Sequence, residues 1–359
     1  MVSFDILHGA GNPRNSEGSF LRTRSGELRY VYTRYTGDSW NDHAAADLAE
    51  LISPDGGMTW RDRGVIIERG DAQNVMSVSL LRLDGANTRL FHLEKRRLPS
   101  GLLICVPVMR RSTDDGETWS APERLIPHDS YNVIHNDRAV LLSSGRIALP
   151  VQQRAFRTNG ANRASSVFML YSDDGGDTWH ESDTVLHPNT RIETKHGLEE
   201  PGLLELEPGK LLCWMRTALG YQYTSLSYDN GNTWSEPLPN LNFPAPNSPM
   251  SMKRDPATGI IYAIWNGTDR RLHPVLPHPE SNGRTPLVIV RSLDNGATWE
   301  TREPRLLETG TERGYCYTAM HFEGGKLLVG YCFGRHLDGG SNLQDTRLRI
   351  IDLKELWKD

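Results

Sequence analysis

The sequence predicts an all-β fold built from about six similar units, and three observations support this. Many short apolar runs are separated by turn residues, with 33 Gly and 21 Pro in 359 residues, while stretches with a helical period are scarce. One eight-residue pattern occurs five times, and six short strands each follow a turn. This mixture is typical of a sandwich, barrel or propeller, and the chain is long enough to bury a substantial core.

The repeated octet is Ser-x-Asp-x-Gly-x-Thr-Trp. It occupies residues 53–60, 112–119, 172–179, 227–234 and 292–299, and successive copies start 59, 60, 55 and 65 residues apart. Internal repeats of this kind indicate one structural unit per period. A period of about 60 residues divides the chain into about six units.

The residue types of the octet predict a hairpin turn. The Asp side chain can accept hydrogen bonds from nearby backbone N–H groups, and the Gly permits a positive φ. The Thr and Trp then enter the next strand, with the Trp as an apolar plug. We therefore expect the five aspartates to be structural and not catalytic or metal-binding.

A second repeat supports the count of units. Short strands that follow a turn are predicted at residues 26–31, 87–93, 145–151, 209–215, 259–265 and 325–330. Six strands against five octets indicate that the last unit lacks the octet. Its closing strand is expected at residues 348–353 or at residues 2–7, because joining the two chain ends removes exposed sheet edges. No linker divides the chain, so residues 1–359 are predicted to form one domain.

Composition excludes several classes of function. The formal charge of −5 argues against a nucleic-acid partner or an acidic membrane surface. The four cysteines show no metal-binding or disulfide pattern, so no metal or other cofactor is expected. No apolar stretch approaches the length that spans a membrane. Residues 1–11 lack the features of a signal peptide, which favours a cytoplasmic location.

The octet resembles the Asp-box, or BNR repeat, of the sialidase (neuraminidase) superfamily. The resemblance covers essentially the whole chain. It implies a six-bladed β-propeller of four-stranded antiparallel blades with five Asp-box turns. Because Asp-boxes also occur in propellers without enzymatic activity, the catalytic positions have to be compared one by one.

The resemblance implies three arginines that bind the carboxylate of the substrate, since guanidinium groups match carboxylate geometry. Arg14 holds the first place, although the Ile-Pro that follows this arginine in the family is absent. Arg216 holds the second place, 16 residues after Glu200, and Arg284 the third, eight residues before Ser292.

The resemblance also implies the catalytic residues. Tyr317 lies 33 residues after Arg284, in the place of the family nucleophile, and Glu200 would be its base. A neutral phenol, with a pKa of about 10, is not repelled by the carboxylate of the substrate. Asp42 would be the general acid and base, with Asp38 as the rival for this role.

Further residues resemble substrate-binding positions. Arg34 resembles an additional substrate-side arginine, and Asp47 takes the place of a second aspartate of the family. Asn74, Asn136 and Asn247 fall where other blades enter the central pocket, where they would contact substrate or cap strands.

Together these residues predict a retaining exo-α-sialidase-like glycoside hydrolase that removes a sialic acid or a related 2-keto sugar acid. The expected partner is thus an anionic carbohydrate. One alternative is a glycosidase or lyase for an arabinan or a uronic acid, because the Ile-Pro and a typical aspartate at position 74 are missing. The other is a carbohydrate-binding propeller without catalysis, which would need no pair of base and nucleophile.

Overall fold

The computed structural model describes residues 2–154, 164–188, 196–268, 277, 279–336 and 340–358. In these residues the regular secondary structure is almost entirely β-strand. The helices are one short 3-10 turn, η1 (Pro279–Ser281), and one short α-helix, α1 (Leu353–Leu356). Neither of these helices has the length to cross a membrane.

Four sheets have four antiparallel strands each. The first contains β2 (Asn15–Arg22), β3 (Leu28–Tyr35), β4 (Ala46–Ser53) and β5 (Arg61–Ile67). The second contains β15 (Glu199–Glu207), β16 (Lys210–Arg216), β17 (Tyr221–Ser227) and β18 (Leu238–Pro244). The third contains β19 (Ser251–Arg254), β20 (Ile261–Asn266), β21 (Leu287–Ser292) and β22 (Arg305–Glu308). The fourth runs β1 (Val2–Ile6), β25 (Asp345–Asp352), β24 (Lys326–Gly334) and β23 (Gly314–Glu323).

The fifth sheet is larger and has nine strands. Its first part contains β6 (Asn74–Asp84), β7 (Asn87–Arg97), β8 (Leu103–Ser112) and β9 (Glu123–Arg124). Its second part contains β10 (Tyr131–Val133), β11 (Val140–Leu141), β12 (Ile147–Arg154), β13 (Ser166–Ser172) and β14 (His180–Glu181). A single parallel residue pair, Tyr131 with Cys105, joins the two parts.

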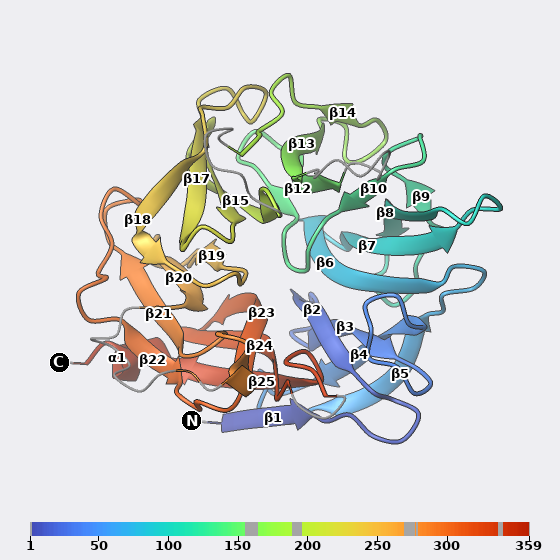
Figure 1. Ribbon diagram of the computed structural model, residues 1–359, viewed down its shortest axis with the longest axis horizontal. Helices are drawn as coiled ribbons and strands as arrows, with labels where there is room; N and C mark the ends of the chain where they lie inside the picture. The colour runs from blue at the N-terminus through green and yellow to red at the C-terminus, as the bar shows by residue number, and fades with distance from the viewer. Residues whose placement is uncertain are drawn as a thin grey trace.

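The predicted hairpin strands are present. The six segments correspond to β3, β7, β12, β16, β20 and β24, each of which is the second strand of a hairpin or follows a short first strand. Both candidates for the closing strand lie in one sheet, because β1 pairs with β25 from Val2–Ile350 to Ile6–Thr346. The two ends of the chain therefore complete the same sheet (Figure 1).

The sheets surround a common centre, with β2, β6, β15, β19 and β23 as their inner strands (Figure 1). The segment after β10 links several of these strands. Asn136 donates hydrogen bonds to the carbonyl oxygens of Gly18 and Tyr317. The Asp137 carboxylate accepts from Lys253 Nζ at 3.0 Å and from the Met320 N–H at 2.9 Å. Polar side chains therefore cross-link the inner strands beneath the centre.

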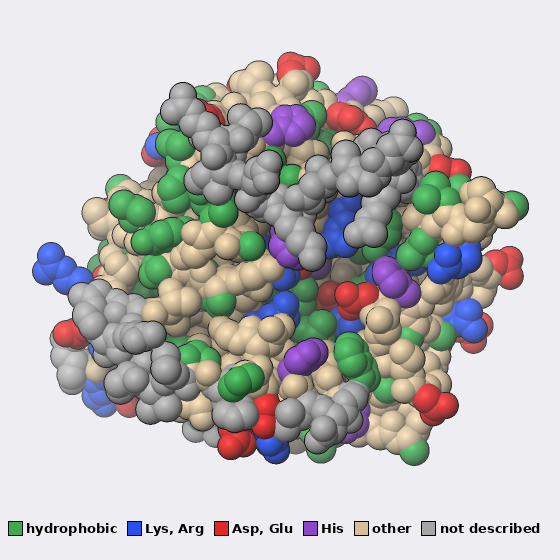
Figure 2. All heavy atoms as spheres, in the orientation of Figure 1, with side chains coloured by type: hydrophobic (Ala, Val, Ile, Leu, Met, Phe, Trp, Pro, Cys, Tyr) green, Lys and Arg blue, Asp and Glu red, His purple; other side chains and the backbone are tan. Residues whose placement is uncertain are grey.

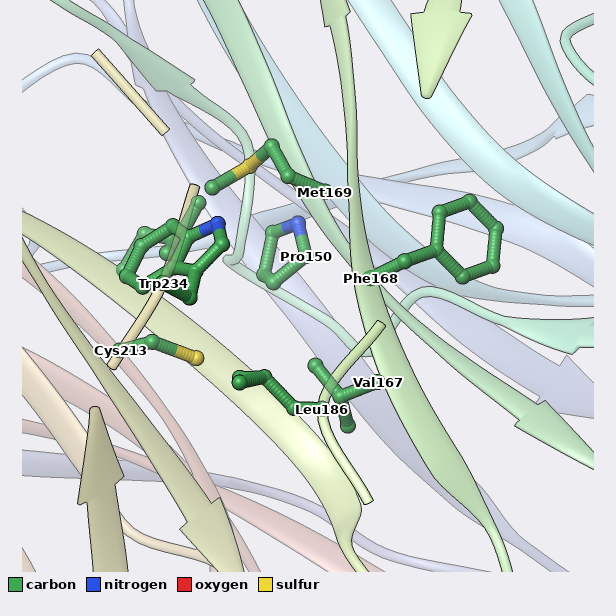
Figure 3. Close-up of a pocket in the computed structure, with 8 residues that line it drawn as sticks. Pro150, Val167, Phe168, Met169, Leu186, Cys213 and Trp234 are labelled. Carbon is green, nitrogen blue, oxygen red and sulfur yellow. The ribbon is translucent and has the colours of Figure 1, made fainter. Parts of the chain in front are cut away.

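Apolar clusters lie between neighbouring sheets. Figure 3 shows one of them, where side chains from β12, β13 and β16 meet Trp234, the last residue of an Asp-box. The gap between these side chains is about 10 Å³, which is room for at most one water. Because all of its lining residues are apolar or weakly polar, this gap belongs to the core and is no candidate for a catalytic site.

All five Asp-boxes have the predicted hydrogen bonds. In the third box, Asp174 Oδ1 accepts from the Thr178 N–H at 2.9 Å, and Oδ2 accepts from Thr178 Oγ1 at 2.6 Å. The Ser172 hydroxyl donates to Asp174 and accepts from the Gly176 N–H at 2.8 Å. The same bonds recur around Asp55, Asp114, Asp229 and Asp294. Both carboxylate oxygens of each aspartate accept hydrogen bonds within their own turn, as a structural role requires.

Replacement of Trp234 by alanine is expected to lower the free energy of unfolding by about 3 kcal/mol, in the lower part of the range for tryptophan in protein cores. Its ring packs against the cluster that contains Met169 and Leu211, and its Nε1–H donates to the Gly231 carbonyl at 2.9 Å. Denaturant unfolding measures the change. Tyr228 of the same box is 70% exposed, so Tyr228→Ala is the control, and equal losses in the two variants would contradict the role of Trp234.

Candidate active site

A polar cavity of about 80 Å³ opens at the centre of the sheets. Its lining residues are Glu17, Asp42, Met76, Ser77, Leu93, Lys95, Tyr131, Val133, His135, Gln152, Arg154, Glu200 and Tyr317. Figure 2 shows basic, acidic and histidine side chains gathered at the centre of this face. Inner strands of different sheets thus bring residues together that are far apart in the sequence.

Four of the lining residues have a left-handed backbone at matching places in inner strands. The φ angles are 56° at Glu17 in β2, 58° at Ser77 in β6, 47° at Glu200 in β15 and 56° at Tyr317 in β23. Each lies at a break in the pairing register with the next strand. Such backbone costs about 1–3 kcal/mol per residue and is concentrated at functional sites. The bulge changes the direction of one side chain in each strand, and here those four side chains line the cavity.

Close packing behind two of these bulges requires glycine. A Cβ on Gly202, two residues after Glu200, would lie 2.1 Å from the Trp214 ring. A Cβ on Gly18, directly after Glu17, would lie 2.4 Å from the Tyr30 ring. The aromatic ring of the second strand therefore presses against the inner strand just beside each bulge. This packing supports the strained backbone from behind.

Tyr317 and Glu200 form the centre of the cavity. The Tyr317 hydroxyl donates to Glu200 Oε1 at 2.7 Å, so the side chains expected to act as nucleophile and base are directly hydrogen-bonded. Arg216 Nη1 donates to the same oxygen at 2.6 Å. The His135 ring stacks on the Tyr317 ring with the centroids 5.5 Å apart, and its Nε2 lies 3.6 Å from Glu200 Oε1. The Glu200 carboxylate is thus surrounded by the Tyr317 phenol, the Arg216 guanidinium and the His135 imidazole.

The charges around this pair set its protonation. Burial alone would raise the pKa of Glu200, but Arg216 and His135 outweigh it and hold the pKa at about 2. Burial raises the pKa of Tyr317 well above its usual value, and the Glu200 charge adds to this. Burial lowers the pKa of His135 to about 4, against the attraction of Glu200. At neutral pH the site therefore holds a neutral phenol, an ionised glutamate and a neutral imidazole.

A second group lies on the other side of the cavity. Arg14 Nη1 donates to Asp42 Oδ1 at 2.6 Å, and its Nη2 lies 3.3 Å from Glu17 Oε2. Lys95 Nζ donates to the backbone carbonyl of Asp42 at 2.6 Å. Partial desolvation would raise the pKa of Asp42, but Arg14 and Lys95 lower it by more, so the net pKa is well below the usual range. Asp38 is exposed and does not line the cavity.

Arg284 lies beside Tyr317 and is 7% exposed. Its Cζ is 5.7 Å from the centre of the Tyr317 ring, and its Nη1 donates to Cys316 Sγ at 3.0 Å. Its Nε has no hydrogen-bond partner, and within the described part of the chain no ion pair to a carboxylate is found for Arg284. Arg216 and Arg284 therefore lie close to the Tyr317 phenol. Arg14 instead contacts Asp42 and Glu17, which line the other side of the cavity.

The structure does not bring Arg34 or Asp47 to the cavity. Arg34 Nη2 donates to Asp62 Oδ2 at 2.7 Å, towards β5. Its neighbour Tyr35 lies under Arg14, with the guanidinium carbon 4.5 Å from the ring centre. Because successive residues of a strand face opposite sides, Arg34 faces away where Tyr35 faces Arg14. Asp47 accepts a hydrogen bond from the Arg69 N–H at 2.8 Å and is no part of the lining.

The three asparagines support other residues of the site. The Asn74 amide donates to the carbonyl oxygens of Asp42 and Ala44, both at 2.9 Å, and so fixes the loop that carries Asp42. Asn247 Oδ1 accepts from Arg216 Nε at 2.6 Å. Asn136 donates to the Tyr317 carbonyl from below, as described above. None of the three lines the cavity.

Several residues of the cavity have no counterpart in the sequence-based prediction. They are Glu17, Lys95, Tyr131, His135, Gln152 and Arg154. Glu17 follows Arg14 by three residues, and His135 directly precedes Asn136. Closeness in sequence to a predicted site residue could therefore have pointed to these two. Arg154 ends β12 and Lys95 lies two residues before the end of β7. Neither belongs to a motif, so nothing in the sequence marks them.

The site combines a phenol that is hydrogen-bonded to an ionised glutamate, two further acidic side chains and several cations. This set can activate a hydroxyl nucleophile and bind an anionic group. Within the described ranges, no cluster of three or more His, Cys, Asp or Glu side chains has the arrangement of a metal site.

Comparison with known proteins identifies the family of this chain. Residues 100–329 match the BNR repeat-like domain family. A sialidase of Bacteroides fragilis (strain YCH46) is 29% identical over 226 residues, a match that covers 59% of this chain and 37% of that protein. A sialidase of Paraclostridium sordellii is 27% identical over 247 residues, covering 59% of this chain and 55% of that protein. The chain therefore spans less than two thirds of either curated relative.

Solved structures show the same fold. The Hadza microbial sialidase Hz136 superimposes with a TM-score of 0.71 at 18% identity, over 96% of this chain and 67% of that one. The family match covers residues 100–329, which is more than half of the chain. The chain thus belongs to the BNR repeat-like domain family, and together with its curated relatives this match assigns it to the sialidase superfamily.

Proposed function

We propose that this protein is a retaining exo-α-sialidase-like glycoside hydrolase that removes a terminal sialic acid or a related 2-keto sugar acid. The observation that carries the proposal is the hydrogen bond of 2.7 Å between the Tyr317 hydroxyl and Glu200. A protein that only binds carbohydrate has no use for a buried phenol on an ionised base. The curated relatives named above are sialidases, and this agrees with the proposal.

In the first step, Tyr317 attacks the anomeric carbon while its proton moves to Glu200. Glu200 is a weak base as long as Arg216 holds it, with Nη1 at 2.6 Å from Oε1. When Arg216 also donates hydrogen bonds to the substrate carboxylate, its interaction with Glu200 weakens. The pKa of Glu200 then rises, and Glu200 becomes a stronger base. Binding of an anionic sugar would therefore activate the nucleophile.

In the same step, Asp42 gives a proton to the glycosidic oxygen as the bond to the leaving group breaks. In the second step, Asp42 takes a proton from water, which attacks the anomeric carbon and releases Tyr317, while Glu200 returns its proton to the Tyr317 oxygen. Asp42 is ionised beside Arg14 in the free protein. It can hold a proton only after Arg14 shifts towards another anion, and the substrate carboxylate is the anion that this mechanism supplies.

Arg14, Arg216 and Arg284 would share the carboxylate of the substrate. Arg284 is the best prepared, because it is buried and its Nε has no hydrogen-bond partner. Arg34 and Asp47 would act, if at all, on parts of the substrate outside the cavity. Asn74, Asn136 and Asn247 would act by holding Asp42, Tyr317 and Arg216 in place.

We further infer a six-bladed propeller formed by residues 1–359 as one domain. The nine-stranded sheet then counts as two blades, since its two parts are joined by the single parallel pair of Tyr131 with Cys105. The other four sheets supply one blade each.

A screen of fluorogenic glycosides tests the proposed function. The substrates are the 4-methylumbelliferyl derivatives of α-N-acetylneuraminic acid, its deaminated analogue, an arabinofuranose and a glucuronic acid. We expect hydrolysis of one of the first two and none of the last two. A preference for the arabinoside or the glucuronide would replace the proposed substrate class, and binding without any hydrolysis would identify a carbohydrate-binding protein.

A further inference from the structure

Glu17 is a buried carboxyl group in the wall of the cavity that the mechanism above does not use. Glu17 is 3% exposed, and its backbone is left-handed with a φ of 56°. The bulge in β2 turns its side chain towards the same cavity as Glu200 and Tyr317. A strained backbone at a lining residue indicates a functional demand on that side chain.

The contacts of Glu17 place it next to the arginine that has to bind the substrate. Glu17 Oε2 lies 3.3 Å from Arg14 Nη2 and 3.4 Å from the Ser16 hydroxyl. Within the described residues, no hydrogen bond to the other oxygen, Oε1, is found. Arg14 therefore already has two carboxylates, Glu17 and Asp42, before any substrate arrives.

A substrate carboxylate at Arg14 would be the third negative group around one guanidinium. Asp42 can meet this change at the surface, because its side chain is 58% exposed and water can screen its charge or protonate it, whereas the side chain of Glu17 is 3% exposed. Two like charges in contact in a buried site cannot both remain ionised without a large cost. A carboxyl and a carboxylate that share one proton avoid that cost, and the carboxyl can donate a hydrogen bond.

The other charges near Glu17 do not remove this conflict. The titratable groups that face it are Arg14 before β2, Tyr35 of β3, Asp42 after β3, Lys95 of β7, Cys105 of β8, Glu200 of β15, Tyr317 of β23 and Cys332 of β24. Only Arg14 and Lys95 are cations among them. Burial raises the pKa of Glu17, and Asp42 and Glu200 raise it further, so that it stays raised against the opposing effects of Arg14 and Lys95.

We propose that Glu17 is a further substrate-binding residue, which takes up one proton from solvent when the carboxylate of an anionic sugar binds beside Arg14. This inference rests on the proposed function, since it assumes an anionic sugar in the cavity. The protonated Glu17 then donates a hydrogen bond to the ligand, and Arg14 is released from one of its internal partners. The affinity for an acidic sugar thus depends on pH through a residue that takes no part in bond breaking.

Isothermal titration calorimetry tests the proton uptake directly. The probe is 2-deoxy-2,3-dehydro-N-acetylneuraminic acid, titrated into the 359-residue protein at one pH in buffers of different ionisation enthalpy. Compared with the wild-type protein, Glu17→Gln should take up about one proton fewer, because the amide is a neutral mimic of the protonated acid. Above the pKa of Glu17, its protonation should make the wild-type affinity fall by up to about tenfold per pH unit. Glu17→Gln should lose this contribution to the slope and bind more tightly than wild type.

Asp42→Asn is the matched control, because it removes the other carboxylate partner of Arg14. It should keep the Glu17-dependent proton uptake. The proposal is overturned if Glu17→Gln takes up as many protons as the wild type, or if the uptake is lost in Asp42→Asn alone. Failure of the proposed function looks different: the wild-type protein then neither binds the probe nor hydrolyses a sialoside, at any pH.

Discussion

Replacement of Tyr317 by phenylalanine is expected to lower kcat towards an aryl α-sialoside by roughly 10³-fold or more, because the proposed nucleophile is removed. The substitution deletes one hydroxyl and leaves the ring on which His135 stacks. Glu200 keeps Arg216 as a partner at 2.6 Å, so the carboxylate is not left without compensation. The binding of a sialic acid analogue should therefore change far less than kcat does, and steady-state kinetics together with calorimetry measure both.

Tyr315→Phe is the matched control, since Tyr315 lies on the same strand, β23, but packs in the core against Tyr331. It should keep wild-type kcat. A second measurement looks for the covalent intermediate: a fluorinated sialic acid whose glycosyl–enzyme breaks down slowly should add its mass to the wild-type protein and not to Tyr317→Phe. Wild-type turnover by Tyr317→Phe, or a mass adduct in this variant, would remove Tyr317 as the nucleophile.

Replacement of Arg284 by alanine is expected to weaken the binding of an anionic substrate by about 2–5 kcal/mol, the range for loss of one partner of a buried charge pair. Arg284 is 7% exposed, its Nε has no hydrogen-bond partner, and no carboxylate within the described residues forms an ion pair with it. A buried cation of this kind is costly unless a ligand supplies the negative charge. Lysine should restore part of the loss, because it keeps the charge without the planar fork.

The measurement compares the affinities for a sialic acid analogue and for the same sugar with its carboxylate reduced to an alcohol. Arg291→Ala serves as the control: Arg291 lies on β21, and its Nε donates to Glu300 at 2.7 Å, away from the cavity. Only Arg284→Ala should lose selectivity for the acid over the alcohol. Equal losses for both ligands would mean that Arg284 supports the pocket and does not recognise the charge.

The sequence predicts the local parts of this fold well, because each depends on neighbouring residues. An Asp-box is complete within eight residues, as the bonds of Asp174 to Thr178 and of Gly176 to Ser172 illustrate. The second hairpin strands also begin where a turn signal precedes an apolar run, as at β16 after Gly209, whose φ is 80°. The pairing of β1 with β25 is less local, and the sequence left two candidates that in fact occupy one sheet.

The candidate site depends partly on family resemblance and partly on geometry that no motif records. The family resemblance placed Glu200 and Tyr317 in the site although they are 117 residues apart, and their hydrogen bond is present. Spacing could not tell that Arg34 faces Asp62, since the side that a strand residue faces depends on the register and on bulges nearby. His135 carries no motif, yet its ring stacks on Tyr317.

The sequence by itself therefore determined the repeated turns, the strands and the superfamily, because hydrogen bonds and apolar patterns within short segments encode them. Only the tertiary structure decided which side chains meet in the cavity. Four left-handed residues in four inner strands, Glu17, Ser77, Glu200 and Tyr317, turn their side chains towards one centre. Such a conformation is unfavourable for each residue alone, so it persists through packing between strands, as with Trp214 against Gly202, and packing of this kind cannot be read from residue spacing.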